Sequence, residues 1–210
     1  MAEEISKLFQ HGDRQFLIAR RLQEHQAFVD VCRAIPINKL DYRPHALSHS
    51  AGELIALLVS GERACGELCE TGKSSYASGL RWHESGGNVS AEALTKEYER
   101  QYHDLQGKLA RLDDTTWGRP AWLVGEDREI LLKDTVGGLL RLALFDAVHH
   151  RGQLSVYIRP AGGVVPSIYG PSRDTPARHQ FGAENASINL SPADALPASK
   201  AIYRHRAISR

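Results

Sequence analysis

Two ionisable side chains, four residues apart, stand out among the residues that could carry chemistry. Asp146 and His150 share a helical stripe with Leu139, Ala143 and Leu154, so the spacing predicts a carboxylate and an imidazole one turn apart on an apolar side. An ionised carboxylate in apolar surroundings must be neutralised by a metal ion, a facing imidazole or buried water. The pair therefore indicates either a divalent metal site or a hydrogen-bonded structural pair.

These two interpretations give the pair different roles. Side chains at i and i+4 converge as ligands, and a carboxylate with an imidazole suits zinc, nickel, iron or manganese. A structural pair would instead form a hydrogen bond and fix the packing of the helix, which is a frequent role for such groups. The spacing leaves both interpretations open.

Four amphipathic segments are predicted to position the pair. The first helix covers residues 13–34 and ends before Pro36. The second opens with Ser50 and Glu53, which match a capping box, and runs to Gly72.

The second half of the chain supplies two more helices. Ser90 is predicted to cap the third helix, and Asp134 to cap the fourth, which ends near Pro160. Residues 72–90 predict a long crossover, and residues 113–129 predict a loop with a short hairpin around 124–127. Four helices with one long middle connection predict an all-α four-helix bundle.

Length, charge and cysteine content narrow the class of protein. The chain of 210 residues has room for one domain with an appendage. Its 26 Lys and Arg residues nearly balance 25 Asp and Glu residues, which disfavours nucleic acid as a partner. No stretch is long and apolar enough to span a membrane, and the three cysteines indicate reduced thiols. We expect a soluble, cytoplasmic protein that binds neither nucleic acid nor membrane.

The composition changes near the C-terminal end of the sequence. Residues 173–210 are rich in Ala, Ser, Pro, Arg and Asn and have no sustained apolar period. We therefore expect a bundle domain over residues 1–172 and an irregular or poorly ordered tail over residues 173–210.

Three other side chains are candidates for chemistry. Cys65 and Cys69 lie one turn apart and could bind a soft metal, but cysteine behaves as a small hydrophobe, so core filling is favoured. Arg151 could bind a carboxylate or phosphate ligand, or it could form an ion pair that ties its helix to a neighbour. Its position gives no preference between the two.

Several segments resemble the DinB/YfiT-like family. The resemblance spans roughly residues 16–174 and is most specific in LFDAVHHRGQL, at 144–154, and in VPSIYGPS, at 165–172; residues 40–44 and 50–54 also contribute. It implies an up-down-down-up four-helix bundle, commonly a homodimer. It also implies a divalent metal held by one histidine of the second helix and two histidines of the fourth.

Transferring those ligands to this chain exposes two departures. The last histidine of the fourth-helix motif matches His150, whereas the earlier position holds Asp146, which could still bind a metal. The second-helix histidine position holds Leu57, which cannot. Glu53, one turn earlier, is a possible replacement ligand.

The resemblance therefore supports two functions. The first is a divalent-metal-dependent enzyme, such as a thiol or small-molecule transferase, with Asp146 and His150 as metal ligands and no assigned catalytic residue. The second is a metal-free binding or dimerisation module that has kept the fold and lost the metal chemistry, as Leu57 suggests.

Overall fold

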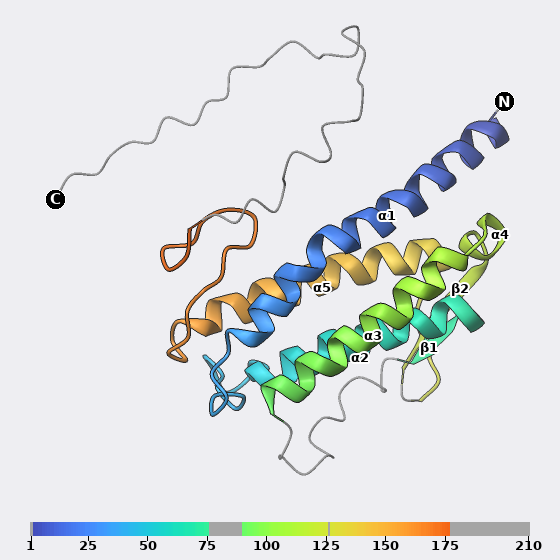
Figure 1. The fold of residues 1–210 in the computed structure, drawn as a ribbon. Helices are drawn as coiled ribbons and strands as arrows, with labels where there is room; N and C mark the ends of the chain where they lie inside the picture. Colours follow the sequence, from blue (N-terminus) through green and yellow to red (C-terminus); the bar gives the residue numbers. More distant parts are fainter. Residues whose placement is uncertain (1, 76–89, 126, 177–210) are drawn as a thin grey trace, which may run out of the picture. The chain divides into compact units, whose positions relative to one another are not determined.

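The computed structural model describes residues 2–75, 90–125 and 127–176 and contains four long helices (Figure 1). These are α1 (Ala2–Arg33), α2 (Ala51–Thr71), α3 (Ala91–Arg111) and α5 (Val136–Ile158). Helix α2 packs against α3 and α5, and α1 packs against the same two helices. In Figure 1, α1 and α5 run in one direction and α2 and α3 run in the other. Each long helix therefore has two helical neighbours around a shared interior.

That interior consists of two apolar clusters along the length of the helices. One cluster joins residues of all four long helices, among them Phe28, Leu54, Tyr98 and Leu154. The other adds the short helix α4 (Asp114–Trp117), whose Trp117 ring lies so close to Gly137 that a Cβ there would overlap it. Burial of these side chains is the main force that holds the helices together.

The ends of α2 follow the local sequence. The Ser50 hydroxyl accepts the backbone N–H of Glu53, and the Glu53 carboxylate accepts the backbone N–H of Ser50, so the predicted capping box is confirmed. Gly72 ends the helix with a left-handed backbone, φ 73°, and donates to the carbonyl of Leu68. Among the described residues, no helix is long and apolar enough to cross a membrane.

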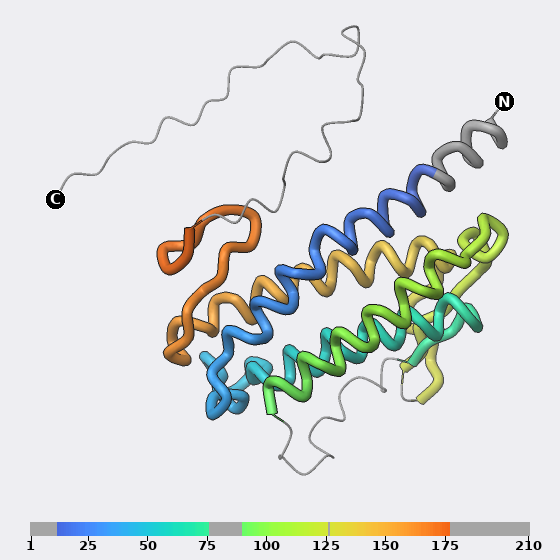
Figure 2. Tube along the Cα trace, in the orientation of Figure 1, coloured from blue at the N-terminus to red at the C-terminus, as the bar shows by residue number. Residues whose placement is uncertain are grey.

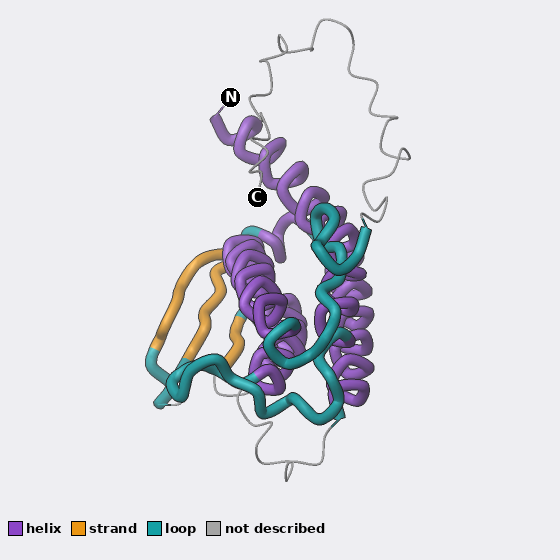
Figure 3. The backbone as a smooth tube through the Cα atoms, turned by 90° about the vertical axis from the view of Figure 1, so that its left-hand side faces the viewer, coloured by secondary structure: helices purple, strands orange, loops and turns teal. Residues whose placement is uncertain are grey.

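A small sheet flanks the helices, so the molecule is mostly helical but the all-α prediction is wrong (Figure 3). The strand order is β1 (Lys73–Ser75), β2 (Pro120–Val124) and β3 (Ile130–Thr135). Strand β1 pairs with β2 in parallel, and β2 pairs with β3 antiparallel. Strands β2 and β3 form the hairpin that was predicted around residues 124–127. Strand β1 was missed because it has only three residues and its partner lies more than 40 residues further along the chain.

Two predicted helix boundaries need correction. Helix α1 begins at Ala2, ahead of the predicted start at Asp13. The N-cap of α5 is Thr135, whose hydroxyl accepts the N–H of Gly138, whereas Asp134 is the last strand residue but one.

Two predicted segments lie largely outside the described residues. The predicted crossover over residues 72–90 contains β1, and its residues 76–89 are not described. Of the predicted tail, only residues 173–176 are described. There, Asp174 pairs with Arg159 and accepts the N–H of Val165, in the segment that follows α5, orange in Figure 2.

Candidate functional site

Asp146 and His150 lie one turn apart on α5, with Asp146 Oδ2 3.3 Å from His150 Nε2. The pair therefore meets as the spacing predicts. The Asp146 side chain is 64% exposed, however, and that of His150 is 19% exposed. The prediction that Asp146 points into the apolar interior is wrong, and solvent can compensate its charge.

The buried side of α5 is turned away from Asp146. It carries Leu140, Leu144, Arg151, Leu154 and Ile158, all of them buried. These residues recur at spacings of three, four and seven, so they define a helical face of their own. Arg151, rather than Asp146, is the charged residue on that face.

The second ring nitrogen of His150 also has a partner. Its Nδ1 lies 2.9 Å from Oε1 of Gln153, which is three residues further along α5. Both ring nitrogens of His150 thus face polar groups of the same helix. A metal ion on His150 would have to displace one of these contacts.

The position expected to complete a metal site is apolar. Leu57 on α2 is partly buried and packs against the first core cluster. The proposed substitute, Glu53, is held at the start of α2 by its cap hydrogen bond and lies 3.6 Å from Arg43 and 3.7 Å from His49. Within the described part of the chain, no three His, Cys, Asp or Glu side chains could hold one metal ion. The residues present do not fit a three-ligand site.

A buried charged network lies between α1, α5 and the segment after α5. Arg151 Nη1 donates to Oε2 of Glu24 at 2.6 Å, and both side chains are at most 3% exposed. Arg151 Nη2 donates to the hydroxyl of Tyr169 at 2.6 Å, and that hydroxyl lies 3.0 Å from Glu24. The guanidinium also lies 4.6 Å from the centre of the Phe28 ring.

Arg151 could have bound a ligand or formed an ion pair between helices. In the structure it forms the ion pair, with Glu24 of α1. Sequence reasoning missed Glu24 altogether. Its signal was available, because Glu24 falls seven residues after Leu17 and four before Phe28, on the apolar stripe of the first helix.

A second buried ion pair and a half-buried histidine lie near the seam between α1 and α3. Arg21 pairs with Glu62 of α2 and donates to Gln106 at 3.0 Å. One turn along, the ring of His25 stacks on that of Tyr102 with centroids 3.7 Å apart. Burial, and to a smaller extent the nearby His103, lowers the pKa of His25 to about 4.

The cysteines fill the core, as predicted. Cys32, Cys65 and Cys69 are all buried free thiols. Burial raises the pKa of Cys65 to about 12 and that of Cys69 to about 11, so the thiolate that a soft metal would need is disfavoured at neutral pH.

Comparisons with known proteins agree with the resemblance seen in the sequence. The model of the DinB family matches residues 12–185. The chain belongs to the DinB family. Its fold is similar to the crystal structure of a DinB-like protein, YjoA, from Bacillus subtilis, with a TM-score of 0.54 and 22% identity. That similarity covers 71% of this chain and 95% of the other, and it concerns the fold alone.

A second relative matches over a short region. The uncharacterized protein YrdA from Bacillus subtilis is 46% identical over 48 residues, which is 23% of this chain and 28% of that protein. The chain therefore spans less than a third of the length of this relative in the match. Membership of the DinB family accounts for the fold and does not by itself assign a reaction to this chain.

Proposed function

We propose that this DinB-family chain is a binding module that works without a divalent metal on α5. The observation that carries this proposal is Leu57, an apolar side chain packed against the core at the position where the family resemblance calls for a histidine. A hydrocarbon side chain supplies no electron pair for a metal.

The contacts of the remaining pair support the same proposal. Asp146 is solvated, and His150 has polar neighbours at both ring nitrogens, so the charges on α5 are compensated by protein and solvent groups. The charge of Asp146 and the ring nitrogens of His150 are therefore compensated without a metal ion.

The outer side of α5 supports a binding role. Leu142, Phe145 and Val156 are 47%, 69% and 69% exposed. A row of large apolar side chains on one helix is typical of a surface that is covered by a partner.

A second candidate function is a divalent-metal-dependent transferase of thiols or other small molecules. The 3.3 Å approach of Asp146 to His150 favours it, because two side chains already converge. A metal held by this pair would polarise a substrate oxygen or lower the pKa of a bound thiol. Its remaining coordination positions would have to come from water or substrate.

A metal titration tests the two candidates. Zinc and nickel are titrated into tag-free protein and into a Leu57→His variant, and binding is followed by calorimetry. We expect weak binding by the parent and affinity at least ~10-fold higher in the variant, because a third ligand joins Asp146 and His150. Leu57→Asn, which adds polarity without an imidazole, is the matched control.

Two outcomes would overturn the proposed function. Tight binding by the parent that is lost in Asp146→Ala would favour the metal-dependent transferase. No gain in Leu57→His would show that position 57 is not the missing ligand position, and the main support for the metal-free module would fall.

A further inference from the structure

One row of side chains crosses the outer face of the small sheet. The strand register places Trp122 of β2 between Lys73 of β1 and Lys133 of β3, and we call these three residues the outer row. Successive side chains of a strand point to opposite faces, and the neighbours Ser74 and Ala121 are buried, Ala121 in the second core cluster. The outer row therefore faces away from the helices, which lie on one side of the sheet in Figure 3.

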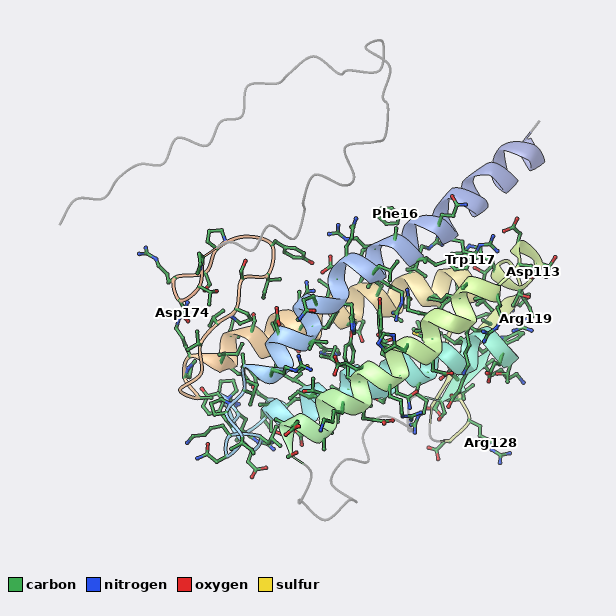
Figure 4. All side chains as sticks on the ribbon, in the orientation of Figure 1. Phe16, Asp113, Trp117, Arg119, Arg128 and Asp174 are labelled. Carbon is green, nitrogen blue, oxygen red and sulfur yellow. The ribbon has the colours of Figure 1, made fainter. Side chains whose placement is uncertain are left out.

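The indole at the centre of the outer row is open to solvent. Trp117, labelled in Figure 4, is 3% exposed and belongs to the second core cluster, whereas Trp122 is half-buried and belongs to neither cluster of the described core. The ammonium group of Lys73 lies 5.8 Å from the centre of the Trp122 ring. Among the described residues, the ring N–H of Trp122 has no hydrogen-bond partner, and it is not enclosed. Trp122 therefore presents a flat aromatic surface and a hydrogen-bond donor.

The two cations of the outer row have no counter-charge in the described part of the chain. Lys73 and Lys133 are exposed, and no described carboxylate pairs with either ammonium group. Asp134, the acidic residue of β3, points to the opposite face, where its carboxylate lies against Gly138. Neighbouring strands are about 4.8 Å apart, so the Cα atoms of the two lysines are about 10 Å apart and both ammonium groups can reach the space over the indole. The outer row is therefore positively charged.

These features select a planar ligand that carries negative charge. The ammonium groups and the indole N–H are all donors, so the ligand must supply the acceptors. A phosphate group has three acceptor oxygens and a charge of about −1.5 to −2 at neutral pH, which matches two ammonium groups better than the single charge of a carboxylate does. An aromatic ring of the ligand can stack on the indole, and such stacking accepts many kinds of ring. A ring joined to a phosphate meets each of these requirements.

We propose that the outer row binds a mononucleotide, whose base stacks on Trp122 and whose phosphate is held by Lys73 and Lys133. One ring and two cations match a single nucleotide, whereas a nucleic-acid strand needs a longer run of cations along its backbone. The near balance of 26 basic and 25 acidic residues in the chain also disfavours a strand. The outer row shares no residue with α5, so this inference goes beyond the proposed function and does not depend on it.

The indole N–H signals of the full chain, in a nitrogen–proton correlation NMR spectrum, give a direct readout. The chain has three tryptophans, and the signal of Trp122 is identified by its loss in Trp122→Phe. Adenosine monophosphate (AMP) is added up to about 10 mM. We expect the Trp122 signal to shift with a dissociation constant of about 1 mM or lower, while the signal of the buried Trp117 stays in place. Adenosine and inorganic phosphate should each bind ~10-fold more weakly or less, because each supplies only part of the contacts.

Charge variants test the role of the two lysines. Lys73→Gln and Lys133→Gln should each raise the dissociation constant for AMP about 3-fold, and the double variant should raise it ~10-fold. Arg128→Gln is the matched control, since it removes an exposed positive charge from the end of the same hairpin, where Figure 4 labels Arg128. That residue is about 15 Å along β3 from Lys133, beyond the Debye length of about 8 Å at physiological salt. The control should therefore bind AMP as the parent does.

Several results would overturn the mononucleotide site, and the same spectra show whether each variant is folded. These results are a Trp122 signal that does not move with AMP, an affinity that is unchanged in the double lysine variant, and inorganic phosphate that binds as tightly as AMP. A single-stranded oligonucleotide that binds ~10-fold more tightly than AMP would assign the outer row to nucleic acid and would also overturn the proposal. Zinc or nickel titration tests the proposed function separately, because Asp146 and His150 lie on α5.

Discussion

At the scale of single residues, the charges that matter most for stability are those that the interior encloses. Glu24 and Arg151 are nearly inaccessible and pair with each other. Arg20 adds a second cation 2.9 Å from Glu24, and Tyr169 closes the network. Asp146, by contrast, is solvated and contributes little to the interior. The distinction comes from helix rotation, which the spacing of charged residues alone did not fix.

Removing one member of the buried pair should be strongly destabilising. Glu24→Gln leaves the Arg151 guanidinium buried without its counter-charge, and we expect a loss of about 3–5 kcal/mol in the free energy of unfolding measured in urea. The double variant Glu24→Leu with Arg151→Met should recover part of that loss. Equal destabilisation by the single and double variants would show that the charges are not coupled.

His25 should make stability depend on pH. Its pKa is about 4 in the folded chain, mainly because of burial, against 6.5 in the unfolded chain. Between these values the unfolded chain binds a proton that the folded chain does not. Above pH 6.5, His25 is neutral in both states and the folded chain keeps its full free energy of unfolding. As the pH falls from 6.5 toward 4, protonation of His25 in the unfolded chain lowers that free energy.

Urea unfolding at about pH 7 and about pH 4.5 checks this dependence. The parent should lose more stability between the two values than His25→Phe, which keeps a ring against Tyr102 and has no proton to bind. Other groups titrate in both the parent and His25→Phe, so the test is the difference between the two proteins in the stability lost from about pH 7 to about pH 4.5. An identical loss in both would rule out His25 as the source.

At the scale of elements, the features recoverable from sequence were those set by neighbours along the chain. The Ser50 and Glu53 cap is confirmed because both partners lie within one turn. The hairpin of β2 and β3 was recoverable because its strands are close in sequence. The addition of β1 to the sheet and the orientation of Asp146 were not recoverable, since they depend on contacts between distant segments and on how α5 rotates against α2. Leu57 was located correctly on α2, because its place follows from the helical spacing after the cap.

The α2 cap offers a test of local stabilisation. In Ser50→Ala the N–H of Glu53 loses its acceptor at a fully buried residue, and we expect a cost of about 1 kcal/mol in urea unfolding. Ser50→Asp retains an acceptor and should cost less. A larger loss in the aspartate variant would indicate that burial of charge outweighs capping at this site.

At the scale of the whole molecule, the family fold is kept while the fourth-helix site differs from the resemblance. The two core clusters and the buried pair of Glu24 with Arg151, which join the long helices, include neither Asp146 nor His150. Residues at the expected metal site can therefore change while the fold is kept, and the apolar Leu57 at the second-helix ligand position is consistent with this.

The buried Glu24 pair also constrains the order of events during synthesis. Glu24 and Arg151 are 127 residues apart, and Tyr169 is 145 residues from Glu24. While the ribosome is still making the last long helix, the Glu24 carboxylate on the nascent first helix has Arg20, one turn earlier and 2.9 Å away, but does not yet have its buried partner Arg151. Closure of the interior around Glu24 must then wait until α5 has emerged, so the early helices stay accessible to chaperones for most of translation.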